Sequence, residues 1–134
     1  MKLIVDSYAW IELFLGGRKA ETVRRMIVAA DEVRTPDIVL TEISRKYLKE
    51  NADDKKVRSR LQTIASTSLV TPIDVEIALR AGTAFLELTQ KAKKENRRSP
   101  SLFDAIVLAT ARTYASKVLT GDEHFQTLTE TIPI

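Results

Sequence analysis

The sequence contains no cysteine and only one histidine, His124, among its 134 residues. The absence of cysteine excludes disulfide bonds, thiolate zinc sites and cysteine nucleophiles, and a single histidine excludes a histidine-rich metal cage. Oxygen ligands are what remains for metal chemistry. No apolar run approaches the roughly 20 residues of a membrane-spanning helix, and the amino terminus lacks the basic start and apolar core of a signal peptide. We therefore expect an intracellular, cytoplasmic protein without a membrane segment.

The length and charge of the chain are those of an ordinary globular protein. A chain of 134 residues fits one domain, 1–134, and is long enough to bury a real core. The formal net charge is only +3, but basic residues form clusters at 18–19, 24–25, 55–60 and 91–98. Each cluster is typical of a solvated helix face. Around an acidic centre, however, such clusters are also what a polyanion-binding site needs.

Short apolar runs alternate with longer segments of helical periodicity along the chain. The runs predict strands at 3–5, 33–35, 69–73 and 117–120, with a possible fifth at 131–134. The periodic segments predict helices at 8–15, 18–30, 38–50, 53–66, 75–95 and 100–115, and a helical turn at 123–128. Pro36 and Asp37 suit the first turn of the third helix. This alternation predicts an α/β fold, a three-layer α/β/α sandwich with a mostly parallel four- or five-stranded sheet.

Asp6 directly follows the first predicted strand. Residues 3–5 are apolar without alternation, which favours a strand buried on both faces. The carboxyl end of such a strand opens onto the crevice where ligands bind when the winding order of the sheet reverses there. Asp6 and Ser7 are also good caps for the helix that follows. Whether Asp6 has more than a capping role depends on whether other acids recur at equivalent places.

Asp122 occupies a similar position after the fourth predicted strand. Gly121 precedes it and lets the backbone turn tightly. The alternative is an ordinary turn aspartate or a cap for the helical turn that follows.

Asp104 lies in the first turns of an almost wholly apolar helix. Ser99 or Ser101 can cap this helix, and an acid in its first turn interacts well with the helix dipole. Asp104 shares its face with Val107 and Leu108, so the element should be buried. An isolated carboxylate is costly there unless it is paired, protonated or bound to a metal. The burial favours a functional role for Asp104.

Glu42 belongs to the helix that follows the second predicted strand. It precedes Arg45 by three residues and Lys46 by four, which is the spacing of an ordinary surface ion pair. Ile38 and Val39 precede it by one turn on the same side, which favours a position facing the interior. Both interpretations remain open from the sequence.

Four short motifs occur in a fixed order: VDS, VLTEI, SLFDAIVLATA and VLTGDEHF. In this order and at these intervals they closely resemble PIN-domain ribonucleases, especially the VapC-type toxins of toxin–antitoxin pairs. The resemblance runs from residue 2 to residue 125. It implies that four positions form the acidic cluster of that family, namely Asp6, Glu42, Asp104 and Asp122. Ser7 and Thr120 match hydroxyl positions that often support this cluster.

The resemblance implies a Mg²⁺- or Mn²⁺-dependent endoribonuclease that hydrolyses RNA phosphodiester bonds. Such a reaction needs a nucleophilic water and a stabilised leaving oxygen, and divalent ions supply both. Magnesium takes hard oxygen ligands and keeps several waters, so a few carboxylates suffice. We expect Asp6, Asp104 and Asp122 to hold the ion directly or through water. Glu42 would bind a second ion or orient the attacking water.

The loop before the helix of Asp104 contains Arg97 and Arg98. We expect these arginines to hold RNA phosphates beside the acidic site. The family resemblance further implies a cognate VapB-type antitoxin protein as a partner and a homodimer as the working unit.

Other functional classes make different demands on the sequence. A response-regulator receiver domain would need adjacent acids after its first strand and a lysine ending a late strand, whereas Lys117 begins its strand. The glycine-rich loops of dinucleotide-binding domains and P-loop proteins are absent. The alternative that stays open is a non-catalytic PIN-like domain that binds RNA or a protein and cuts nothing.

Overall fold

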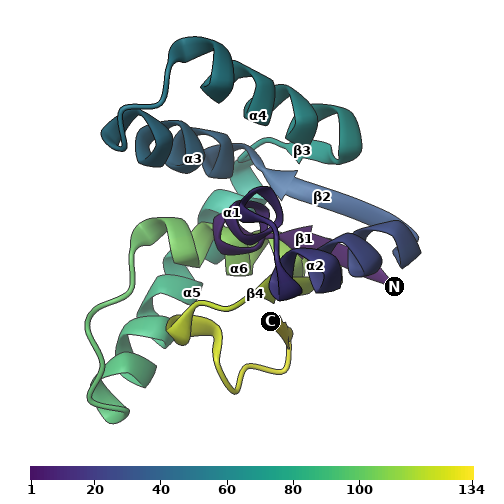
Figure 1. The fold of residues 1–134 in the computed structure, drawn as a ribbon. Coiled ribbons are helices and arrows are strands. Elements are labelled where there is room, and N and C mark those ends of the chain that lie inside the picture. Colours follow the sequence, from purple (N-terminus) through teal and green to yellow (C-terminus); the bar gives the residue numbers. More distant parts are fainter.

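A computed structural model describes residues 1–134 and confirms the alternation of strands and helices (Figure 1). The elements are β1 (Lys2–Val5), α1 (Ser7–Leu15), α2 (Arg18–Ala29), β2 (Glu32–Pro36), α3 (Asp37–Lys49), α4 (Asp54–Thr67), β3 (Leu69–Thr71), α5 (Val75–Lys94), α6 (Leu102–Thr113), β4 (Lys117–Thr120), the 3-10 turn η1 (Glu123–Phe125) and β5 (Thr131–Pro133). No helix is both long and apolar enough to cross a membrane.

The five strands form one sheet in the order β3-β2-β1-β4-β5, and every neighbouring pair is parallel. The central strand β1 pairs with β2 and β4, so that Ile4 lies opposite Arg34 on one side and Val118 on the other. The chain first builds outward from β1 to β3 and later continues on the other side with β4 and β5. The winding order therefore reverses between β1 and β4, and the carboxyl ends of these two strands border the crevice expected at such a point.

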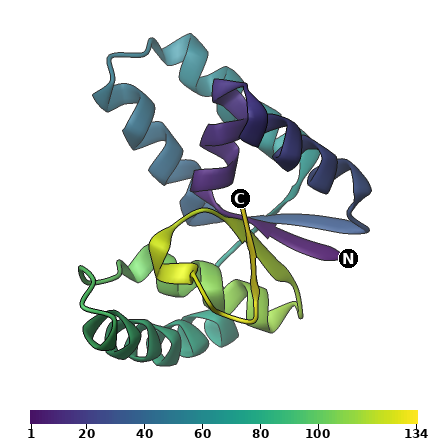
Figure 2. The same cartoon turned by 60° about the horizontal axis from the view of Figure 1, so that its bottom comes forward.

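Helices cover both faces of the sheet, which makes the fold a three-layer α/β/α sandwich. In Figure 2, α5 and α6 lie together on one face, and α1 to α4 lie on the other. Helix α6 packs against β1, β2 and β4. Parallel sheets need such cover because their strands are buried on both sides.

The core is centred on β1 and on the helix that crosses beneath it. Leu3, Ile4 and Val5 are fully buried, which explains why the strand is apolar without alternation. Residues 105–111 of α6 are buried without interruption. Burying each large aliphatic side chain contributes roughly 1.5–3 kcal/mol to folding. The ends of β1 and α6 are therefore attached to the most firmly packed part of the molecule.

Several predicted boundaries differ from the structure by a few residues. The helix predicted from residue 100 begins at Leu102, because Ser101 caps it and leaves Pro100 outside. The third strand ends at Thr71, since Pro72 has no N–H to donate to a neighbouring strand. The predicted helical turn at 123–128 is only the three residues of η1.

Candidate active site

Asp6 lies at the carboxyl end of β1 and is 5% exposed. Its Oδ1 accepts a hydrogen bond of 2.8 Å from the backbone N–H of Ser7, so the predicted capping role is present. Its Oδ2 accepts a hydrogen bond of 2.8 Å from the hydroxyl of Thr120 at the end of β4. Each carboxylate oxygen has a second lone pair, so both can still accept a cation or a proton. Asp6 is thus fixed in orientation without being saturated.

Thr120 connects two of the predicted acidic positions. While its hydroxyl donates to Asp6, its Oγ1 also accepts a hydrogen bond of 3.0 Å from the backbone N–H of Asp122. The Ser7 hydroxyl makes no hydrogen bond within the chain, and Ser7 is half-buried next to Asp6. Of the two predicted supporting hydroxyls, Thr120 is therefore the one that positions the acids in this structure.

Asp122 follows β4 after a turn at Gly121. Its Oδ1 accepts a hydrogen bond of 2.8 Å from the backbone N–H of His124 and caps η1. A Cβ atom at position 121 would overlap the ring of Tyr8, so only glycine fits the turn without displacing that ring. Tyr8 is in α1, directly after Asp6 and Ser7. The packing of Tyr8 on Gly121 therefore holds the two acidic strand ends together.

Asp104 is the third residue of α6 and forms a capping box with Ser101. Its Oδ2 accepts a hydrogen bond of 2.9 Å from the backbone N–H of Ser101, and the Ser101 hydroxyl accepts one of 3.1 Å from the Asp104 N–H. Burial raises the pKa of Asp104, and the negative charge of Asp122 adds to the rise. The capping hydrogen bond uses only part of the acceptor capacity of Asp104. Its carboxylate therefore keeps free lone pairs near the negative charge of Asp122.

Glu42 is half-buried on α3 and faces the same region from the other side of the sheet edge. Burial raises its pKa to about 8, the charges of Asp6 and Asp104 add to the rise, and Arg45 opposes it. Burial likewise raises the pKa of Asp6 to about 6 against the hydrogen bonds from Thr120 and Ser7. The carboxyl groups are therefore close enough for their charges to act on one another.

The surface ion pair considered for Glu42 is not formed. Lys46, four residues further along, pairs instead with Glu50 at 2.8 Å. Arg45 is exposed and has no acidic partner within 4 Å. The charges that act on Glu42 are instead those of Asp6, Asp104 and Asp122, with Arg45 opposing them.

The four acids share a region, but their side chains do not form a ready-made metal centre. No group of three or more acidic or histidine side chains is close enough to ligate one ion as the side chains stand. Their donor chemistry nevertheless fits a hard divalent ion, which takes a few carboxylates and completes its shell with water. Like charges about 4 Å apart repel by about 4 kcal/mol at an effective dielectric of about 20. Carboxylates without a cation are therefore expected to turn apart.

The two arginines predicted to hold phosphates lie beside Asp122. Arg97 pairs with Glu123 at 3.4 Å and with Glu95 at 3.1 Å, and Arg98 pairs with Glu123 at 3.2 Å. Glu123 thus draws the loop between α5 and α6 toward the turn that carries Asp122. Their RNA-binding role stays a prediction, and part of their charge is neutralised within the chain.

His124 is a neighbour of the site that the sequence analysis did not single out. It is buried, and its positive form would lower the pKa of Asp104. Its Nε2 lies 3.9 Å from Glu123. The sequence signal was present, since His124 is two residues after Asp122, but a lone histidine next to an acid gives no direction for its side chain.

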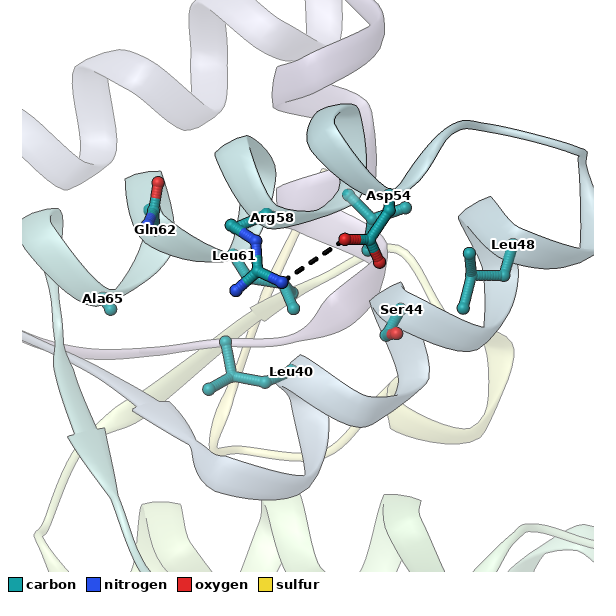
Figure 3. Close-up of a pocket in the computed structure, with 9 residues that line it drawn as sticks. Leu40, Ser44, Leu48, Asp54, Arg58, Leu61, Gln62 and Ala65 are labelled. Carbon is teal, nitrogen blue, oxygen red and sulfur yellow. Dashed lines mark hydrogen bonds and ion pairs between the residues drawn. The ribbon is translucent and has the colours of Figure 1, made fainter.

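An apolar pocket of about 340 Å³ lies elsewhere, between α3 and α4 (Figure 3). Arg58 and Asp54 pair at its rim at 3.3 Å. None of the four acids lines it. The lining residues are Leu40, Ser44, Leu48, Asp54, Val57, Arg58, Leu61, Gln62 and Ala65. Because its two charged groups neutralise each other, this pocket offers no hydrolytic chemistry.

Comparisons with known proteins identify the family and the fold of the chain. The family model of the PIN domain matches residues 3–130. No curated protein sequence matches the chain. Among solved structures, a toxin–antitoxin complex from Klebsiella pneumoniae is similar, with 23% identity and a TM-score of 0.68 over 97% of this chain and 95% of that one.

Two further solved structures have the same fold. VapBC-1 from nontypeable Haemophilus influenzae is 15% identical, with a TM-score of 0.72 over 99% of this chain and 98% of the other. VapC20 from Mycobacterium tuberculosis, a sarcin–ricin loop cleaving toxin, is 18% identical, with a TM-score of 0.71 over 98% of this chain and 99% of the other. At these identities the likeness concerns the fold. Because the family model matches residues 3–130, almost the whole chain, the chain belongs to the PIN domain family.

Proposed function

We propose that this protein is a Mg²⁺- or Mn²⁺-dependent endoribonuclease and the toxin of a VapBC-type toxin–antitoxin pair. The proposal is supported by the mutual influence of Asp6, Glu42, Asp104 and Asp122, whose charges act on one another at the carboxyl edge of the sheet. There, burial and mutual repulsion raise the pKa of Glu42 to about 8. Membership of the PIN family and the similar toxin structures support it. Action on cellular RNA would take place in the cytoplasm.

The three aspartates are the residues that would hold the ion. Each is oriented by a hydrogen bond from the chain: Asp6 by Thr120, Asp104 by the Ser101 N–H, and Asp122 by the His124 N–H. Each keeps free lone pairs on its carboxylate. When bound, a divalent ion lowers the pKa of a water and stabilises the charge on the leaving oxygen.

Glu42 would act on the attacking water. With its pKa at about 8, Glu42 holds a proton at neutral pH when no cation is near. A cation beside it favours the ionised form. In its ionised form the Glu42 carboxylate would accept a hydrogen bond from the attacking water and take up the proton that this water loses. In the metal-free chain, burial brings the pKa of Glu42 close to neutral pH. A carboxyl group with such a pKa can change its protonation state readily near neutral pH.

The proposed partners are an antitoxin and a second copy of the chain. Several of the similar solved structures are VapBC complexes, which supports a VapB-type antitoxin as a partner here. The homodimer is proposed from the family resemblance alone. Light scattering on the purified protein should then give roughly twice the monomer mass of 15.1 kDa. A monomer at micromolar concentration would contradict the dimer and leave the nuclease proposal intact.

The nuclease proposal is tested by the Asp104→Asn variant. This change keeps the shape of the side chain but removes its negative charge. Cleavage of RNA in Mg²⁺ or Mn²⁺ should therefore fall more than about 100-fold. A residue that only supports a metal ligand, without touching the metal, typically costs less when it is changed. The matched control is Asp54→Asn, an acid-to-amide change at the rim of the α3–α4 pocket, which should cleave like the wild type.

Equal cleavage by wild type and Asp104→Asn would overturn the nuclease proposal. RNA binding without cleavage by the wild type would favour the non-catalytic interaction domain instead. Induced expression in a bacterial host gives a second readout, because growth arrest by the wild type should disappear with Asp104→Asn.

A further inference from the structure

The basic residues around the acidic site differ in whether their charge is already used. Arg97 and Arg98 both pair with Glu123. On α3, by contrast, Arg45 and Lys49 are exposed and neither has an acidic partner within 4 Å. Arg45 on α3 is therefore an unpaired positive charge that acts on one of the acids, since it lowers the pKa of Glu42.

These α3 cations line an open, shallow groove between side chains of this one helix, which begins one turn beyond Glu42. The groove has a volume of about 560 Å³ and is lined by Arg45, Lys46, Lys49 and Glu50. Lys46 and Glu50 form an ion pair at 2.8 Å, so together they contribute no net charge. Arg45 and Lys49 remain as the two free charges. Because they are four residues apart on one helix, their side chains begin about 5–6 Å apart on the same face.

Arg45 is also electrostatically connected to the acids. Its charge acts on Glu42, which in turn senses Asp6 and Asp104. The order along the surface is thus the aspartates, then Glu42, then Arg45, then Lys49. A helix dipole by itself favours basic residues in a last turn, which accounts for Lys46 and Lys49. It does not account for an unpaired arginine directly beside the acidic site.

We propose that the RNA strand cut at the acidic site continues along the exposed face of α3, where Arg45 and Lys49 each neutralise a backbone phosphate. This rests on the proposed nuclease function and adds the direction of the strand. Contacts of this kind position a strand without reading its bases. Arg45 and Lys49 are positioning residues in this arrangement, and the acids do the chemistry.

The test is binding of a single-stranded RNA oligonucleotide in EDTA, followed by fluorescence anisotropy over a range of salt concentrations. The test variant is the pair Arg45→Gln with Lys49→Gln. The matched control is Lys2→Gln with Arg25→Gln, which removes one lysine and one arginine, both exposed and unpaired, away from α3. Thermal melts should show that both variants fold, because substitutions of exposed side chains change stability little.

The test variant should bind RNA at least about tenfold more weakly than the control. The slope of log affinity against log salt should also become shallower by about 0.7 for each lost contact on a single strand, and so by about 1.4 for both. In a cleavage assay with Mn²⁺, the same variant should show a raised KM with kcat retained. A control that loses affinity equally would mean that net charge, not this groove, attracts RNA, and would overturn the proposal.

Two other results separate this inference from the nuclease proposal. If the wild type cleaves RNA and the test variant matches it in salt slope and in KM, the α3 path is wrong while the nuclease stands. If the Arg98→Gln variant loses more affinity than the α3 pair, the strand follows the α5–α6 loop and the α3 path is again wrong. If the wild type neither binds nor cuts RNA, both proposals fail together.

Discussion

The two faces of α3 border two regions that differ in whether their charged side chains are paired with a group of opposite charge. On one face, Glu42 is half-buried without a basic partner within 4 Å, and burial together with the charges of Asp6 and Asp104 raises its pKa to about 8. On the other, the pocket shared with α4 is apolar, and its charged residues Asp54 and Arg58 pair with each other. Folding alone explains the second arrangement. The first costs free energy in the metal-free protein, and such uncompensated acids point to chemistry.

The largest expected difference between the acidic site and the α3–α4 pocket is in how strongly their residues affect stabilisation by a divalent metal ion. Millimolar Mg²⁺ or Mn²⁺ should raise the melting temperature of the wild type by several degrees, because a ligand at 100 times its Kd contributes about 2.7 kcal/mol. The Asp6→Asn variant should lose most of this rise, and Asp54→Asn should keep it. Differential scanning fluorimetry measures all three. A wild-type melting curve unaffected by metal would contradict the cluster as an ion site.

A smaller effect is expected on the pH dependence of stability. A carboxyl whose pKa is higher in the folded than in the unfolded state binds more protons when folded, so stability falls as pH rises. For Glu42 this loss spans the range from its ordinary 4.5 to about 8. In EDTA, the melting temperature of the wild type should therefore decline between pH 5 and pH 8, and Glu42→Gln should flatten the decline.

The matched control for this pH series is Glu76→Gln, at an exposed glutamate of α5 that pairs with Arg80. It should follow the wild-type curve. A Glu42→Gln curve as steep as that of the wild type would mean that Glu42 does not titrate as its surroundings require.

The smallest effect is expected in the α3–α4 pocket. Asp54→Asn breaks only an exposed ion pair with Arg58, and such pairs contribute about 0–1 kcal/mol. Thermal or urea unfolding should place this variant within about 0.5 kcal/mol of the wild type at every pH from 6 to 8. A large loss here would show that the two faces of α3 do not differ as described.

The order of elements could be predicted from the sequence because it depends on local patterns. Residues 3–5 are all apolar, residues 105–111 are apolar except for Thr110, and both stretches are buried as expected. The predicted fifth strand is present and pairs with β4. Boundaries were less predictable, because Ser99 and Ser101 are equally good caps by sequence, and only the hydrogen bonds of Ser101 decide between them.

The site could be predicted only in part. The carboxyl ends of parallel strands meet at one edge, so placing Asp6 and Asp122 together needed no coordinates. The pairing of Arg97 and Arg98 with Glu123 joins residues about 25 positions apart, and no local pattern encodes it. The same holds for Lys46, whose choice of Glu50 over Glu42 depends on Glu42 facing inward.

The hydrogen bond from Thr120 to Asp6 joins residues 114 positions apart. Asp6 follows β1, the first strand of the sheet, whereas its hydrogen-bond partner lies on β4, the fourth strand along the chain. A growing chain that has not reached β4 lacks Thr120, Asp122 and the sheet edge that orients Asp6. The proposed catalytic assembly can therefore form only after β4 has been synthesised and has paired with β1.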